Sequence, residues 1–229
     1  MKLYVANPTL RKLLSVLIPA LLIPATVLAG AMLFEAGAYV WISLIVAVLS
    51  LVLLIAGFER REIGTRRTVL VSIMVAMCIV GRIIPLFKPV SAICILTAVY
   101  LGPQAGFYTG ATAALLSNFL FGQGPWTPFQ MLAWGLIGLF AGLLAKPLQK
   151  SRILLLLYGV ASGVAFSVVM DVWSVLWMSG TLTPAAFSAA LLAALPHTAL
   201  YAVSNLVFLL VLATPIGDKL ARIKLKYGV

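Results

Sequence analysis

Long apolar runs dominate this chain, and short polar or proline-rich segments interrupt them. Because an α-helix rises about 1.5 Å per residue, one membrane crossing needs about 20 apolar residues. The pattern predicts eight spans: Leu13–Leu33, Tyr39–Gly57, Thr68–Ile84, Val90–Leu101, Gln104–Phe121, Phe129–Ala145, Ile153–Met178 and Ala185–Leu212. The fourth run is shorter than a full crossing requires. The sequence therefore predicts an all-α, multi-pass integral membrane protein.

Composition agrees with this class, because 63% of the residues are apolar and only 9% are charged. Such a balance excludes an ordinary water-soluble domain. The net charge of +11 would point to nucleic acid in a soluble protein, so the positions of the basic residues decide its meaning.

Fourteen of the sixteen basic residues fall in segments that an even-numbered bundle places on one side of the membrane. They are Lys2, Arg11, Lys12, Arg60, Arg61, Arg66, Arg67, Lys146, Lys150, Arg152, Lys219, Arg222, Lys224 and Lys226. The positive-inside rule makes that side cytoplasmic, together with both termini. The charge therefore indicates orientation in a cell membrane, in contact with lipid, and not a nucleic-acid partner.

The basic segment 59–67 divides the chain into two parts. Residues 1–58 form a predicted transmembrane hairpin with few polar groups, and residues 59–229 form a six-helix core with a basic cytoplasmic tail. In the tail, Thr214 and Pro215 suit the start of a short interfacial helix, although a solvated basic stop sequence explains the same residues. Function is expected in the six-helix core.

Small residues recur at four-residue spacing on two of the core helices, and they allow backbones to approach closely. The positions are Gly102, Gly106, Gly110, Ala114, Gly138 and Gly142. We expect ordinary packing between helices here, and the same for Cys78 and Cys94. By contrast, Ser72 and Ala76 form one small pair on an otherwise bulky helix, which indicates a surface that docks a partner helix.

Two ionisable residues, Arg82 and Asp171, lie inside predicted spans at similar depth in the outer half of the membrane. Intramembrane charges are costly and are functional candidates for that reason. One interpretation is an ion pair that locks two helices, and the other is a pair that lines an external cavity. The sequence leaves both open.

Further polar and aromatic side chains converge on the external face. His197, Tyr201 and Asn205 are spaced i, i+4, i+8 and share one stripe of the last span. The remaining candidates are Lys88, Asn118, Gln123, Trp126, Gln130 and Trp134. We expect the set to bind a solute under proline-stiffened loops, by stacking and amide-type hydrogen bonds.

Enzyme chemistry has little support. There is no HExxH sequence and no carboxylate pair on one helix, so no metal site is expected. The segment from Gly159 to Ser162 misses the GxSG spacing of an intramembrane serine protease by one residue, and no Walker sequence is present. We expect no catalysis and no cofactor held by this chain.

The segment SNFLFGQGPWTPFQMLAWGLIGLFAGLL, preceded by GPQAGFYTGATAA and followed downstream by DKLARIKLKYG, resembles the S components of energy-coupling-factor (ECF) vitamin transporters. The resemblance covers roughly Thr68 to Val229. The hairpin departs from the six-helix S-component core and is closer to longer members of the cobalamin or queuosine type.

The resemblance implies a mechanism. An S component binds a micronutrient from outside and joins a transmembrane coupling protein, which two cytoplasmic ATPases drive with ATP. It topples in the membrane to carry its site inward. The helix that meets the coupling protein often has an AxxxA pattern, and here Ala76 fits while Ser72 and Val80 replace its neighbours.

Resemblance favours cobalamin, whose many amides suit the predicted site. A queuosine precursor would also stack and accept amide bonds, and an anionic vitamin could use Arg82 and Lys88. Two other classes stay open: a membrane scaffold without a solute, and a self-sufficient secondary transporter, for which coupling carboxylates are nearly absent.

Overall fold

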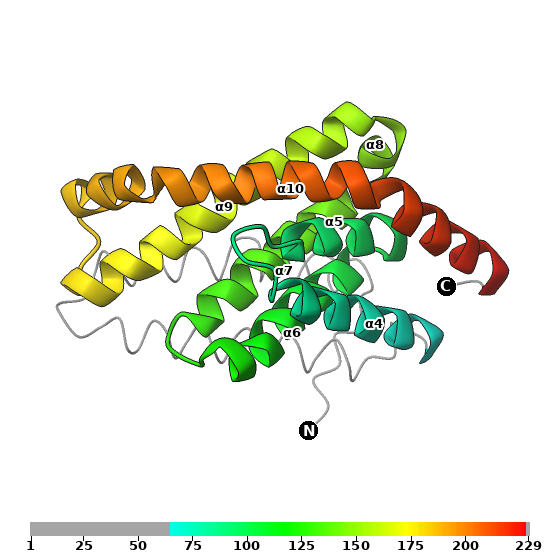
Figure 1. Cartoon of the computed structure of the whole chain (residues 1–229), viewed down its shortest axis with the longest axis horizontal. Coiled ribbons are helices and arrows are strands. Elements are labelled where there is room, and N and C mark those ends of the chain that lie inside the picture. Colours follow the sequence, from blue (N-terminus) through cyan, green and yellow to red (C-terminus); the bar gives the residue numbers. More distant parts are fainter. Residues whose placement is uncertain (1–64, 228–229) are drawn as a thin grey trace, which may run out of the picture.

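The computed structural model describes residues 65–227, which form seven helices and no strand. In chain order they are α4 (Thr65–Gly81), α5 (Val90–Leu101), α6 (Pro103–Phe121), α7 (Thr127–Leu143), α8 (Ala145–Lys150), α9 (Arg152–Ser179) and α10 (Pro184–Tyr227), as Figure 1 shows. The predicted hairpin of residues 1–58 lies outside the described residues. Within them, the all-α prediction is confirmed.

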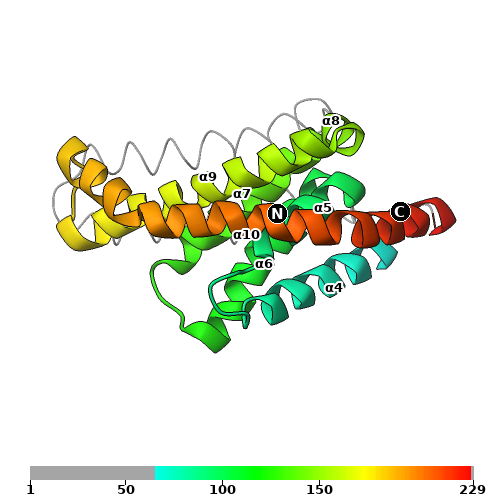
Figure 2. The same ribbon diagram turned by 45° about the horizontal axis from the view of Figure 1, so that its top comes forward.

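The six longer helices match the six predicted core spans to within a few residues at most ends. By length and apolar composition alone, α9 and α10 are the two described helices that could cross a membrane, while α5 and α7 are shorter apolar helices. Membrane-like composition is therefore concentrated in the two helices that lie together in Figures 1 and 2.

Local chemistry explains where the helices begin and end. Gly102 separates α5 from α6 with φ of 97°, and Pro103 follows at the first turn of α6, where its missing N–H is harmless. Gly180 ends α9 in the left-handed conformation. At the other end of α9, the Ser151 side chain accepts a hydrogen bond from the Leu154 N–H.

The C-terminal tail differs from the prediction, because α10 continues without a break to Tyr227 and Thr214 caps no separate helix. Pro215 lies inside α10, where it removes one backbone hydrogen bond. Packing beyond the proline outweighs that loss: Leu220 is buried, and Gly217 lies against the Tyr100 ring. The Tyr227 carbonyl also accepts a hydrogen bond from Arg66.

A glycine seam joins α6 to α7. A side chain at Gly106 or at Gly138 would strike the backbone of the other residue, and one at Gly142 would strike Gly102 and Pro103. From the contact of Gly106 with Gly138 to that of Gly102 with Gly142, the position goes back four residues on one segment and forward four on the other. This is the pattern of antiparallel neighbours. The predicted use of these glycines in internal packing is confirmed, and Cys78 and Cys94 are likewise fully buried in the core.

The helices α9 and α10 form an antiparallel pair beside the glycine seam (Figure 2). The Ser167 and Thr198 hydroxyls share a hydrogen bond of 2.6 Å, and the Asn205 amide donates to the Gly159 carbonyl at 3.0 Å. Arg152 donates to the Leu210 carbonyl at 2.9 Å. These bonds fix the register of the pair along its length.

The start of α4, the short helix α8 and the end of α10 all lie at one end of the molecule (Figure 1). Most basic residues of the described chain belong to those segments or, in the case of Arg152, to the start of α9 just after α8: Arg66, Arg67, Lys146, Lys150, Arg152, Lys219, Arg222, Lys224 and Lys226. The three-dimensional charge distribution is thus as one-sided as the sequence predicts.

Replacing Gly138 by Ala should destabilise the fold by about 1–3 kcal/mol, because the added methyl group meets backbone that cannot move cheaply. The matched control is Gly159→Ala, whose methyl group meets mainly the movable end of the Leu209 side chain. Thermal unfolding in detergent measures both. Equal melting temperatures for the two variants would contradict the glycine-seam interpretation.

Candidate functional site

Arg82 is the centre of the polar interior. The sequence predicts it inside a span, but α4 ends at Gly81, so Arg82 lies in the turn that follows the helix. Its side chain is nevertheless only 9% exposed. One guanidinium nitrogen, Nη1, donates hydrogen bonds to the Ser117 hydroxyl and, at 2.8 Å, to the Asn118 amide oxygen.

The same guanidinium contacts aromatic rings. Its central carbon lies 5.2 Å from the Trp134 ring centroid and 5.1 Å from that of Phe121, within the range of cation–π attraction. The Nε atom of Arg82 is buried and has no hydrogen-bond partner in the described part of the chain. Arg82 therefore retains an unused donor.

Asn118 on α6 connects the groups around this arginine. Its amide nitrogen donates to the Thr127 hydroxyl at 2.8 Å and to the Gln130 side-chain oxygen at 3.0 Å. Thr127 in turn donates to the Gln123 side-chain oxygen at 2.9 Å. Three amides predicted to bind a solute are thus joined to one another, and both N–H donors of Asn118 are already in use.

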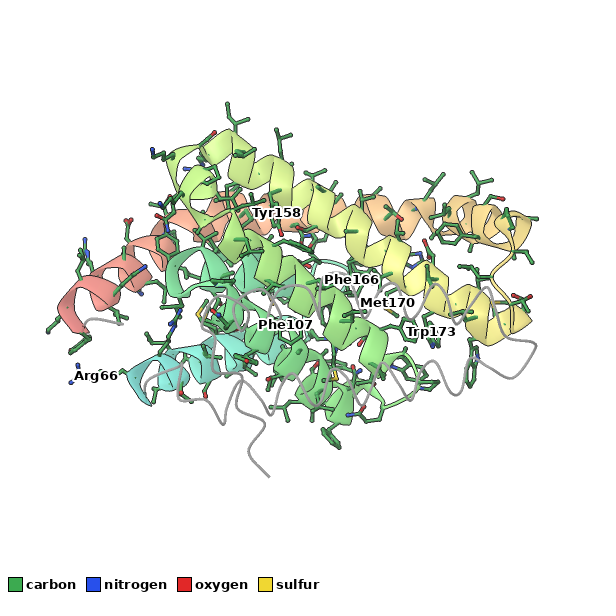
Figure 3. The ribbon with its side chains drawn as sticks, turned by 180° about the vertical axis from the view of Figure 1, so that it is seen from behind. Arg66, Phe107, Tyr158, Phe166, Met170 and Trp173 are labelled. Atoms are coloured by element: carbon green, nitrogen blue, oxygen red, sulfur yellow. The ribbon has the colours of Figure 1, made fainter. Side chains whose placement is uncertain are left out.

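An aromatic row leads away from Arg82 across three helices. Trp134 of α7 stacks on Phe166 of α9 with ring centroids 4.8 Å apart, and Phe166 meets Tyr201 of α10 edge-on at 5.0 Å. Figure 3 shows Phe166, Met170 and Trp173 following one another along the side of α9 that faces α7. Trp134 and Phe166 are only 4% and 3% exposed, so the aromatic row is a packed part of the core that joins α7, α9 and α10.

A second aromatic group covers the end of this row. Trp126, in the loop before α7, meets Trp173 edge-on at 5.8 Å, and Trp173 stacks with Trp177 at 6.2 Å. The Trp126 ring also lies against Gly124, where any side chain would collide with it. The loop is thus held over α9 by aromatic contacts.

Asp171 of α9 lies near Tyr201, the α10 member of the aromatic row. It is 8% exposed, and its Oδ2 atom has no hydrogen-bond partner among the described residues. Its carboxylate lies within electrostatic range of His197 and Tyr201 on α10. Since Arg82 bonds to Ser117 and Asn118, no ion pair joins it to Asp171 in the described chain.

Lys88 lies half-buried in the loop between α4 and α5. Its carbonyl accepts a hydrogen bond of 3.1 Å from Ser204, which ties the loop to α10. Burial, and secondarily the positive charge of Arg82, lower the pKa of the Lys88 side chain. The loop therefore brings two cations near each other.

The stripe predicted on the last span faces α9, but its members differ in role. Tyr201 belongs to the aromatic row and His197 is an exposed neighbour of Asp171. Asn205 is 2% exposed and its amide nitrogen is bound to Gly159, so it holds the two helices together. Asn205 therefore lies outside the candidate site.

Sequence reasoning missed four residues of the site. Ser117 and Thr127 join the Arg82 network, and Phe166 and Trp173 build the aromatic surface. Trp173 had a usable signal, because it lies two residues after the deep Asp171 and one turn before Trp177. Phe166 had none, since it is one of many apolar residues of α9.

The predicted docking residues are on the outside of α4. Ser72 and Ala76 are both exposed, and the Ser72 hydroxyl donates to the Thr68 carbonyl at 3.0 Å within the same helix. They lie between the exposed apolar side chains Val69, Ile73 and Val80. This face of α4 is available to another helix or to lipid.

With this geometry in view, comparison with known proteins gives one match. The model of the ECF-type riboflavin transporter S component family matches residues 62–222, which include every described helix except the C-terminal end of α10. No curated protein and no solved structure matches the chain. The chain therefore belongs to the ECF-type riboflavin transporter S component family.

Membership makes the chain a membrane transporter subunit and not an enzyme. Subunits of this family bind a small molecule and work with the membrane and ATPase components of an ECF transporter. The predicted S component is thus confirmed. The cobalamin substrate stays a prediction, because the family name refers to a different vitamin.

Replacing Asn118 by Ala should lower stability by about 2–4 kcal/mol, because several buried partners lose a hydrogen bond at once. Gln123→Ala is the control, since the side chain of Gln123 is exposed and its partner Thr127 keeps the hydrogen bond from Asn118. Thermal melting of both variants in detergent measures the difference. A melting temperature of Asn118→Ala at or above that of the control would show that the network does not support the fold.

Proposed function

We propose that this chain captures a flat, uncharged heteroaromatic solute of the riboflavin type for an ECF importer. The observation that carries the proposal is the aromatic row Trp134–Phe166–Tyr201, with the buried cation of Arg82 at one end and the buried acid Asp171 at the other. The name of the family to which the chain belongs supports the same substrate class.

The chemistry of a flavin fits those groups. Its fused rings are flat and apolar on both faces, which suits contact with tryptophan and phenylalanine. One edge carries carbonyl acceptors, for which the unused Nε–H of Arg82 is a donor. The imide N–H and the ribityl hydroxyls are donors, and Asp171 offers an acceptor. A neutral solute with both kinds of group matches both ends of the row.

The amide-rich site expected for cobalamin is less well supported. Asn118 uses both of its N–H donors inside the protein, and Gln123 donates to the Leu115 carbonyl at 2.9 Å. A corrinoid or a queuosine precursor would have to displace these bonds. Flavin binding to the Nε atom of Arg82 and the Oδ2 atom of Asp171 displaces no hydrogen bond of those two atoms. The ring system enters the row by parting the buried stack of Trp134 and Phe166.

In this proposal the basic end of the molecule is cytoplasmic, as the positive-inside rule predicts. The solute then enters at the opposite end, where the loop carrying Trp126 meets α9. The exposed face of α4 around Ser72 and Ala76 meets the coupling protein, which two ATPases drive.

The first test titrates the purified full-length protein with riboflavin and follows quenching of flavin fluorescence. We expect saturable binding, and a loss of about tenfold in affinity for Arg82→Lys, which keeps a charge but loses the planar guanidinium and its Nε donor. The control Arg66→Lys changes an exposed arginine at the basic end and should bind as the parent does.

Cyanocobalamin and a deazapurine queuosine precursor serve as competitors. Tight binding of either, with none of riboflavin, would overturn the proposed substrate.

The second test concerns the coupling face. Ala76→Trp should abolish co-purification with the coupling protein and ATPases, because a large ring prevents close helix approach, while riboflavin binding is unchanged. Ala161→Trp, at an exposed position of α9, is the matched control and should leave the complex intact. Loss of the complex in both variants, or in neither, would contradict docking through α4.

A further inference from the structure

The Asp171 carboxylate stands out among the buried polar groups of the described chain. Its Oδ2 atom has no hydrogen-bond partner, although the side chain is only 8% exposed. Neighbouring polar groups on the same helix pair are satisfied: Ser162 donates to the Tyr158 carbonyl, Ser167 pairs with Thr198, and Asn205 donates to Gly159. A buried acceptor without a donor costs free energy, so natural proteins retain few of them.

The surroundings of Asp171 do not supply the missing donor. The two titratable groups of α10 within electrostatic range are His197 and Tyr201, and neither donates to Oδ2. Tyr201 also lies within electrostatic range of Arg82, so the two buried ionisable groups have this phenol as a common neighbour. A solute that contacts Tyr201 at the α10 end of the aromatic row would therefore lie near the carboxylate.

We propose that Asp171 determines specificity by accepting a hydrogen bond from an uncharged donor group of the bound solute, an imide N–H or a hydroxyl. This inference rests on the proposed function. In a site with little water, a carboxylate attracts such donors and repels a phosphate, because like charges interact strongly at low dielectric. The site should therefore prefer riboflavin to its 5′-phosphate, FMN, which has the same ring system.

The test compares the parent protein with Asp171→Asn, which keeps the size of the side chain and removes the charge. Both are purified at full length, and binding of riboflavin and of FMN is measured by fluorescence quenching. Asp218→Asn is the matched control, because it makes the same change at an exposed position of α10.

For Asp171→Asn we expect at least about tenfold weaker riboflavin binding, the effect of losing a charge-assisted hydrogen bond. The preference for riboflavin over FMN should shrink at the same time, because the repulsion is gone. Without solute, the melting temperature should stay constant or rise, since the substitution removes an unmatched buried charge. Asp218→Asn should bind as the parent does.

Other outcomes overturn the inference. Unchanged riboflavin affinity in Asp171→Asn would remove Asp171 from the site while leaving the proposed function intact. A lower melting temperature in the absence of solute, together with an unchanged ratio of riboflavin to FMN affinity, would make the residue structural. Failure of the parent protein itself to bind riboflavin would overturn the proposed function, and this result is distinguishable because it does not depend on the variant.

Discussion

The burial of one positive charge organises the polar interior of this protein. A guanidinium in an apolar environment is tolerated only when hydrogen bonds and electron-rich surfaces replace water around it. Arg82 obtains them from Ser117 and Asn118 on α6 and from the Trp134 ring on α7. Because the arginine comes directly after α4, this single group ties three helices together at the level where the aromatic row begins.

The glycine seam makes that arrangement possible. Close approach of α6 and α7 through Gly106 and Gly138 brings Asn118 and Gln130 within hydrogen-bonding distance on the same two helices. It also aligns Trp134 with Phe166 on α9. The packing of the small residues therefore determines where the polar residues lie, and a substitution in the glycine seam would alter the site.

Two kinds of polar group can be distinguished in the candidate site: those that are hydrogen-bonded within the protein and support the fold, and those that are available to a solute. Asn118 donates to Gln130 and to Thr127, and Gln123 bonds to Thr127 and to the Leu115 carbonyl, which fixes the loop before α7. Among the described residues, the buried side-chain atoms without a hydrogen-bond partner include two in the candidate site, Nε of Arg82 and Oδ2 of Asp171. A transporter subunit gains from this division, since a preformed site orders few side chains when the solute binds.

The sequence by itself determined the class, the core helices and most of their ends, because membrane length and turn residues such as Gly102 and Gly180 act locally. It also determined which residues are polar in an apolar setting, and so most members of the candidate site. Only the tertiary structure decided how those groups are used. The continuation of α10 past Pro215 depends on packing against Tyr100, a contact across more than a hundred residues. In the same way, Asn118 is bound inside the protein because residues outside its own helix supply its partners. Asp171 is left unmatched because no described residue supplies a donor to its Oδ2 atom. Hydrogen-bond satisfaction is a property of three-dimensional neighbours, and spacing along one helix cannot reveal it.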